Sequence, residues 1–155
     1  MKLFANFIAL LLMLSPTILL AEDFNIEEEE LASLPKSVDA AVRADKSFED
    51  YKECKLIGKA IDLTGQADSG FAVTTEDGCE WGASLGPIWV VYDTKPSPSV
   101  VLADGGNSLT LGKNAQNGLR NIATSAGTAG WYTEKLWKYD GKSYIKVKEQ
   151  TATPK

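Results

Sequence analysis

The chain has 155 residues, of which 44% are hydrophobic and 24% charged, so disorder and collagen-like structure are excluded for most of its length. It contains no histidine, which excludes mechanisms that need an imidazole base or an imidazole metal ligand. The net charge of −5 argues against nucleic acid or an anionic membrane surface as a partner. It favours a basic partner, although acidity also keeps a small exported protein soluble.

Residues 1–21 have the pattern of a secretory signal peptide. Lys2 supplies a positive start, Leu3–Leu20 is largely apolar, and the small Ala21 precedes an acidic stretch. An uncleaved membrane anchor is the alternative, but Pro16 and the small residue favour cleavage. The sequence therefore predicts a periplasmic or secreted protein with no stable membrane insertion after cleavage.

Residues 22–34 are acidic, with four consecutive glutamates at 27–30. Because adjacent like charges repel, we expect a mobile arm or the frayed start of a helix. Ser33 is a candidate helix cap and Pro35 suits a first turn. Apolar residues then recur at spacings of three and four, which predicts one helix, straight or kinked, over Pro35–Glu53.

From Cys54 onward, short apolar runs alternate with Gly, Asp, Asn, Ser and Pro, which indicates strands and turns. The expected strands are Lys55–Asp62, Gly70–Thr75, Ile88–Asp93, Ser99–Ala103, Ser108–Leu111, Leu119–Ser125, Glu134–Tyr139 and Ser143–Lys148. Asp140-Gly141 predicts a hairpin, and Glu76-Asp77-Gly78 a second tight turn. The expected fold class is mostly β (α+β): residues 35–150 form one small antiparallel β-domain of about eight short strands with an N-terminal helix, followed by a polar tail at 151–155.

Two parts of this domain resemble each other. Gly70–Thr74 resembles Gly118–Thr124, and Ile88–Asp93 resembles Leu136–Asp140, if gaps are allowed. An internal duplication of a β unit would explain the similarity, and chance is the alternative.

The sequence contains two cysteines, Cys54 and Cys79. In an exported chain they most simply form one disulfide. A catalytic redox pair is the alternative, but the C-x-x-C spacing typical of such pairs is missing.

Two other segments resemble functional motifs but lack residues that those motifs need. Gly82–Gly86 matches G-x-S-x-G, but a serine nucleophile in that motif needs a histidine, so we expect a flexible loop. Asp62–Gly70 alternates oxygen-bearing side chains as calcium loops do. It offers only two carboxylates, so an ordinary polar turn is favoured, and no metal or cofactor is expected.

The aromatic residues are the best candidates for binding. Trp89 and Trp137 fall within expected strands and are predicted core residues. Trp81, Trp131 and Tyr132 fall in glycine-rich segments, where rigid aromatic side chains serve as binding anchors or cap the open end of a small core. The nearby acids Glu76, Asp77 and Glu80 would steer a basic partner, or else form a solvated turn.

Several segments between Ala60 and Val147 carry a family resemblance. They are Asp62–Gly65, Cys79, Trp89–Tyr92, Asn117–Ile122 and, most specifically, Leu136–Tyr144. Together they resemble exported bacterial domains with degenerate FG-GAP-like repeats. The resemblance implies a binding module, similar in build to periplasmic lysozyme-inhibitor-like and immunity proteins.

The sequence thus predicts an exported, non-enzymatic protein-binding module of the cell envelope. Its sharper form is an inhibitor or immunity protein against a periplasmic hydrolase. A module that binds a small ligand or glycan is the alternative, in which the same aromatic side chains stack on sugar rings. An enzyme that uses only carboxylates is a third hypothesis, and it requires two acids facing each other in a cleft.

Overall fold

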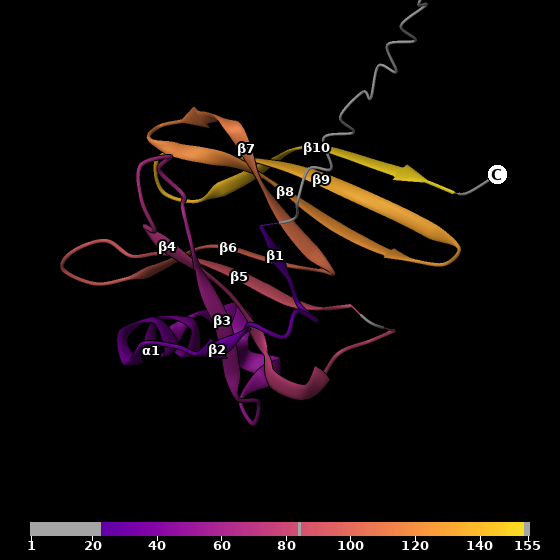
Figure 1. The fold of residues 1–155 in the computed structure, drawn as a ribbon, viewed down its shortest axis with the longest axis horizontal. Helices are drawn as coiled ribbons and strands as arrows, with labels where there is room; N and C mark the ends of the chain where they lie inside the picture. The colour runs from indigo at the N-terminus through magenta and orange to yellow at the C-terminus, as the bar shows by residue number, and fades with distance from the viewer. Residues whose placement is uncertain (1–22, 84, 154–155) are drawn as a thin grey trace, which may run out of the picture.

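The computed structural model describes residues 23–83 and 85–153, which form two antiparallel five-stranded sheets packed face to face (Figure 1). The N-terminal sheet contains, in spatial order, β2 (Ala32–Ser33), β3 (Leu56–Ile61), β4 (Gly70–Thr75), β5 (Gly86–Tyr92) and β6 (Ser99–Gly106). The C-terminal sheet contains β1 (Phe24–Asn25), β7 (Ser108–Gln116), β8 (Leu119–Thr128), β9 (Trp131–Tyr139) and β10 (Tyr144–Ala152). The mostly β fold class is confirmed.

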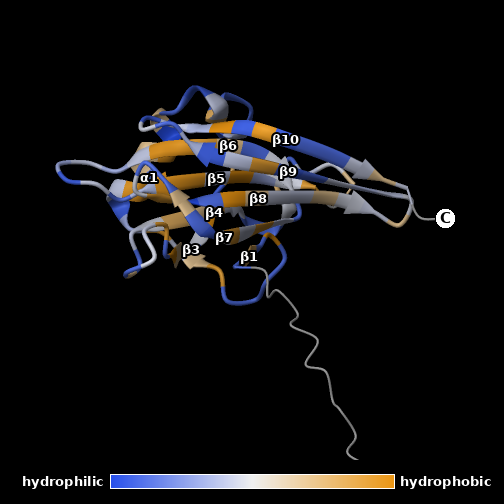
Figure 2. Cartoon of the chain, turned by 90° about the horizontal axis from the view of Figure 1, so that it is seen from above, coloured by the Kyte–Doolittle hydropathy of each residue, from blue (hydrophilic) through white to orange (hydrophobic). Residues whose placement is uncertain are grey.

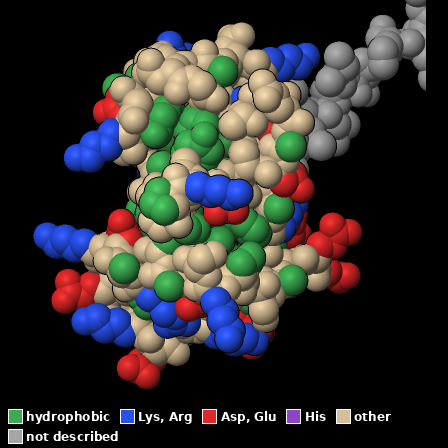
Figure 3. Space-filling model, turned by 90° about the vertical axis from the view of Figure 1, so that its left-hand side faces the viewer, with side chains coloured by type: hydrophobic (Ala, Val, Ile, Leu, Met, Phe, Trp, Pro, Cys, Tyr) green, Lys and Arg blue, Asp and Glu red, His purple; other side chains and the backbone are tan. Residues whose placement is uncertain are grey.

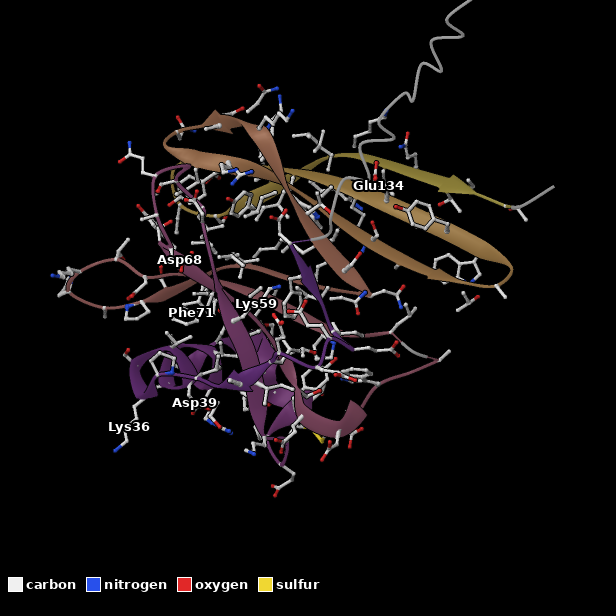
Figure 4. The ribbon with its side chains drawn as sticks, viewed as in Figure 1. Lys36, Asp39, Lys59, Asp68, Phe71 and Glu134 are labelled. Carbon is white, nitrogen blue, oxygen red and sulfur yellow. A yellow bond between two sulfur atoms is a disulfide. The ribbon has the colours of Figure 1, made fainter. Side chains whose placement is uncertain are left out.

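Helices cover the outer face of the N-terminal sheet and create a third layer. These are α1 (Lys36–Ala44) and the 3-10 helix η1 (Lys46–Tyr51), while a short 3-10 turn, η2 (Glu76–Gly78), follows β4. In Figure 4, Phe71 of β4 lies on the side of the sheet that faces α1, and Lys36 and Asp39 lie in the helical layer. Among the described residues, no helix is both long and apolar enough to cross a membrane.

The interior strand β5 contributes side chains to both hydrophobic clusters of the protein. Ile88 and Val90 face the C-terminal sheet, whereas Trp89 and Val91 face the helices. All four side chains are at most 1% exposed. This explains why the sequence of β5 is continuously apolar, because a strand covered on both faces has no polar side. Figure 2 shows the apolar segments of neighbouring strands gathered around it.

The predicted helix over 35–53 is two helices. Asp45 has extended backbone angles (φ −76°, ψ 141°), and its side chain accepts a hydrogen bond of 2.9 Å from the Ser47 amide. Asp45 therefore ends α1 and caps η1. Val38 and Val42, one turn apart, and Phe48 bury their side chains against the N-terminal sheet.

The segment after residue 22 differs from the expected mobile arm. Phe24 and Ile26 are 0% and 2% exposed in the core between the sheets, and β1 pairs with β7. Glu28 forms an ion pair of 2.8 Å with Lys59 on β3, which is labelled in Figure 4. Ser33 lies in β2 and does not cap a helix. Burial of apolar side chains outweighs repulsion between the glutamates. The predicted signal peptide, residues 1–21, lies outside the described residues.

The eight predicted strands are all present, and several extend further than expected. β7 continues to Gln116, β9 begins at Trp131, and β10 runs through Thr151 into the predicted tail. The predicted turns are confirmed: the Asp140 side chain accepts hydrogen bonds of 2.8 Å from the amides of Lys142 and Ser143 in the β9–β10 hairpin, and η2 forms the turn at Glu76.

The similar sequence units occupy equivalent places in the two sheets. β4 and β8 are each the third strand in their sheet's order, and β5 and β9 are each the fourth. Each sheet is a four-stranded meander with a two-residue strand added at the same edge. The equivalence holds for strands and not for every side chain, because Trp89 packs towards the helices and Trp137 towards the other sheet.

Replacing Phe24 tests whether the segment after residue 22 is part of the core. Phe24→Ala should lower the free energy of unfolding by about 3–5 kcal/mol, because it removes a fully buried ring. Denaturant unfolding measures the change, with exposed Glu30→Ala as the control from the same segment. Equal stability of the two variants would mean that the segment is mobile.

Stability should fall in alkali because of Tyr144. Burial raises the pKa of this phenol, whose hydroxyl donates a 2.7 Å hydrogen bond to the Arg120 carbonyl. The folded state therefore favours the neutral phenol. Below about pH 10 the phenol is neutral in both states and Tyr144 contributes its full stabilisation. Above that pH the unfolded chain ionises first, so the free energy of unfolding falls by up to about 1.4 kcal/mol per pH unit. Unfolding measured from pH 8 to 11 should show a shallower decline in Tyr144→Phe than in the exposed control Tyr132→Phe.

Candidate functional site

One end of the sandwich contains a hollow of about 480 Å³, which we call the end hollow. Figure 1 shows the β8–β9 hairpin and the end of β10 projecting at this end, above the segment that joins β4 to β5. Residues from both sheets and from η1 line it: Tyr51, Glu80, Leu85, Trp131, Lys135 and Glu149. The opposite end of the molecule, seen in Figure 3, has hydrophobic side chains gathered near its middle.

The upper wall of the end hollow is the β8–β9 hairpin. The sequence predicts a glycine-rich loop here, but β8 runs to Thr128 and β9 starts at Trp131. Gly127 permits this close pairing, because a Cβ at its position would lie 2.9 Å from the Trp131 carbonyl oxygen. Trp131 lines the end hollow and is 36% exposed.

Tyr132 lies on the other face of β9, because successive strand residues point in opposite directions. Its hydroxyl lies 2.9 Å from the Ser125 hydroxyl and 3.5 Å from a carboxylate oxygen of Glu134. Figure 4 shows Glu134 on the side of the C-terminal sheet that faces away from the N-terminal sheet. Trp131 and Tyr132, predicted together as anchors, therefore do not form one surface.

The lower wall is formed by Glu80, Gly82, Leu85 and Gly86. The predicted disulfide between Cys54 and Cys79 is confirmed, with a Cα–Cα distance of 5.8 Å. The disulfide joins Cys54, three residues after the end of η1, to Cys79, which directly precedes Glu80. The disulfide therefore keeps the segments that carry Tyr51 and Glu80 next to each other, and both of these residues line the end hollow. Burial raises the pKa of the Tyr51 phenol, and the negative charges of Asp50 and Glu80 raise it further.

Trp81 supports this wall from behind. Its indole N–H donates a 2.7 Å hydrogen bond to the Thr75 hydroxyl, and its ring packs against the core between the sheets. The ring lies so close to Gly86 that a Cβ there would approach it to 2.7 Å. The side chain is half-buried, which is the arrangement expected of an aromatic residue that caps the open end of a core.

The three predicted acids are separated. Glu80 is exposed and lines the end hollow. Glu76 accepts a 2.6 Å hydrogen bond from Lys55, and Asp77 is exposed on the η2 turn with φ of +53°. Of the six predicted binding residues, Trp131 and Glu80 meet at the end hollow.

Sequence analysis missed Lys135 and its partner Asp104. Lys135 of β9 forms a 2.6 Å ion pair with Asp104 of β6, whose second oxygen accepts a 2.6 Å hydrogen bond from Thr124 of β8. The Thr124 hydroxyl in turn accepts a 2.9 Å hydrogen bond from the Trp137 indole. The side chain of Asp104 is only 9% exposed, so this network joins the two sheets beside the end hollow.

Tyr51 and Glu149 were also missed as lining residues. Glu149 lies near the end of β10, and a hydrogen bond from Lys146 lowers its pKa. Strand register was the one available clue to these residues. Lys135 lies two residues before the inward-facing Trp137 and so points to the same face of β9, and Glu149 lies opposite Lys135 in the sheet. The sequence could not show that strand pairing extends so far.

These groups make the end hollow suitable for a cation. Lys135 is paired with Asp104 and Glu149 with Lys146, so among the described lining residues Glu80 is the carboxylate outside the described ion pairs. Trp131 and Tyr51 add aromatic surface on which a guanidinium or ammonium group can stack. The lining therefore combines the acidic and aromatic groups that are suited to binding a cationic side chain.

The other predicted motifs lie elsewhere or fold as turns. Oδ1 of Asp62 accepts hydrogen bonds from the amides of Thr64, Gly65 and Gln66, at 2.7 to 3.2 Å, and so holds a local turn, while Oδ2 lies 3.7 Å from Arg120. Within residues 23–83 and 85–153, no group of three or more Asp, Glu, His or Cys side chains could hold a metal ion. Ser84 lies outside the described residues, and the strand β5, not a helix, begins at Gly86.

Removing the disulfide should loosen the lower wall. The double variant Cys54→Ser/Cys79→Ser should lose about 3 kcal/mol of stability, because the bond closes a loop with a sequence separation of 25. Hydrogen exchange should become faster in residues 79–83 than in the β8–β9 hairpin. A uniform increase in exchange across both walls would contradict a local tethering role.

Comparison of the chain with protein-family models, curated proteins and solved structures finds no match. The resemblance to FG-GAP-like repeats therefore stays a prediction from the sequence. The residues of the end hollow and their chemistry are the basis on which a function can be argued.

Proposed function

We propose that the protein is an exported, non-enzymatic module that binds a basic protein partner at the end hollow. The observation that carries this proposal is the convergence of Trp131, Tyr51 and the carboxylates of Glu80 and Glu149 around a hollow of about 480 Å³. Export is inferred from the leader-like residues 1–21, and the Cys54–Cys79 disulfide fits an oxidising compartment.

The lining supports recognition of a cationic side chain. Trp131 is a rigid aromatic residue held by the β8–β9 hairpin, so it loses little conformational freedom on binding. Glu80 would attract a basic partner and pair with one of its Arg or Lys residues. The finer proposal is that the partner is a basic cell-wall hydrolase and that binding inhibits it.

The acids of the end hollow suit binding better than glycosidase chemistry. A glycosidase needs one carboxyl group that remains protonated as a general acid and a second that is ionised. The hydrogen bond from Lys146 lowers the pKa of Glu149 and so favours its carboxylate form. Glu149 is therefore unsuited to donate a proton as a general acid.

A small-ligand or glycan-binding module is the second candidate. The volume of the end hollow falls within the range of about 300–1,000 Å³ found for small-molecule sites. Trp131 offers a ring on which a sugar could stack. This candidate uses the same hollow but does not need its acidic charge, so the two proposals predict different effects of Glu80.

Titration calorimetry with a basic lysozyme tests the proposal, with an acidic protein of similar size as the negative control. Trp131→Ala should weaken binding about 30-fold, since a buried aromatic anchor contributes about 2 kcal/mol. Glu80→Gln should slow association and reduce its dependence on salt. Tyr132→Ala, on the opposite face of the same strand, is the matched control and should bind as the wild type does.

Each other outcome has a distinct meaning. Binding that is insensitive to Trp131→Ala and Glu80→Gln would remove the end hollow as the site. If chitin oligosaccharides change the tryptophan fluorescence while the basic protein does not bind, the glycan-binding candidate replaces the proposal. Binding without loss of lysozyme activity would retain the binding module and reject inhibition.

A further inference from the structure

Three hollows lie along one strand, β6. Gly105 borders the end hollow, Ala103–Gly105 border a second hollow of about 220 Å³, and Val100–Ala103 border a third of about 220 Å³. They follow six consecutive residues of β6, from Val100 to Gly105. The end hollow is thus the first part of a longer depression along this strand.

The depression has two walls. On one side stand residues of the helical layer, Asp45, Ser47 and Tyr51. On the other side stand residues of the C-terminal sheet: Trp131, Lys135, Trp137 and Tyr144. Figure 2 shows β6 and β10 running along the same side of the sandwich, away from β1 and β3. We call this side the open side.

β6 is an edge strand without outward-facing charged side chains. Among the described strands it pairs only with β5, so alternate residues turn their N–H and C=O groups towards the open side. Its residues are Ser-Val-Val-Leu-Ala-Asp-Gly-Gly, and the one charge, Asp104, is turned inward to Lys135. Exposed Ala103 and Gly105 leave the backbone accessible.

The other edge strand on the open side, β10, is protected. It carries Lys146, Lys148 and Glu149 within nine residues. Both edge strands have one register shift, between Lys146 and Lys148 in β10 and between Val100 and Leu102 in β6, so the two strands differ in charge and not in regularity. Charged side chains of this kind oppose pairing with a further strand. The contrast indicates that β6 is the edge that can accept one.

The charges along the depression select its occupant. Its described charged lining residues are four acids, Asp45, Glu80, Asp104 and Glu149, and one base, Lys135. Asp104 pairs with Lys135 and Glu149 with Lys146, so Asp45 and Glu80 are the lining acids outside the described ion pairs. A second copy of this chain would place the same acids against each other, which disfavours self-pairing. A basic segment complements them.

We propose that β6 accepts an extended segment of about six residues from the basic partner as an added antiparallel or parallel strand, with an Arg or Lys side chain of that segment in the end hollow. Six residues in a strand span about 20 Å. Backbone hydrogen bonds to β6 would provide affinity, and the end hollow would provide selectivity for the cation. This inference rests on the proposed function and adds the mode of binding.

The probe is the peptide acetyl-Thr-Val-Arg-Val-Arg-Val-Thr-amide, titrated into the intact protein and followed by NMR. Binding of the peptide should slow hydrogen exchange of the Ala103 or Gly105 amide. N-methylation of alternate peptide residues should abolish this binding, because it removes the backbone N–H groups that pair with β6. Ala103→Lys should weaken binding at least tenfold, because it places a positive charge on the accepting strand. Ile145→Lys, which adds the same charge to an exposed position of β10, is the matched control.

The outcomes separate the two proposals. Strand addition is overturned if the N-methylated peptide binds as tightly as the unmodified one. It is also overturned if Ala103→Lys and Ile145→Lys have the same affinity for the peptide. Either result would stand even when Trp131→Ala still weakens lysozyme binding. The proposed function fails instead if Trp131→Ala and Glu80→Gln change neither ligand's affinity. Dimerisation of the wild type that is lost in Ala103→Lys would show that a second copy occupies β6, and would also overturn the proposal.

Discussion

The burial of β5 on both faces is the constraint on which the rest of the structure depends. Ile88 and Val90 hold the C-terminal sheet, while Trp89 and Val91 hold the helices. One strand therefore joins three layers, and no other described strand contributes as much to both clusters. Because every side chain of its central run is buried, a polar substitution there would leave an unpaired group in one of the two cores.

The candidate site arises where this regular packing stops. β8, β9 and β10 continue beyond the core, and the disulfide-tethered segment after Cys79 faces them across the end hollow. The core ends with Trp81, which closes it by packing against Gly86 and bonding to Thr75. Trp131, at the start of β9 in the other sheet, is left partly exposed, so the two tryptophans that look alike in sequence have different roles.

The network of Lys135, Asp104, Thr124 and Trp137 connects stability with the site. It spans both sheets, and it uses the only charge of β6 for internal pairing. As a result Lys135 contributes little positive charge to the end hollow, and β6 presents an uncharged edge. A single ion pair thereby sets both the acidic character of the hollow and the accessibility of the strand proposed to receive a partner.

The sequence by itself determined the strands, the turns at Glu76 and Asp140, and the disulfide, because each depends on local patterns or on the presence of just two cysteines. It did not determine that the acidic segment after residue 22 is ordered, because Phe24 and Ile26 are fixed by distant residues of β7 and the core. It identified Trp131 and Glu80 but missed Tyr51, Lys135 and Glu149. Only the tertiary structure could bring these together, because their proximity depends on strand register, on the length of the β8–β9 hairpin and on the packing of two sheets.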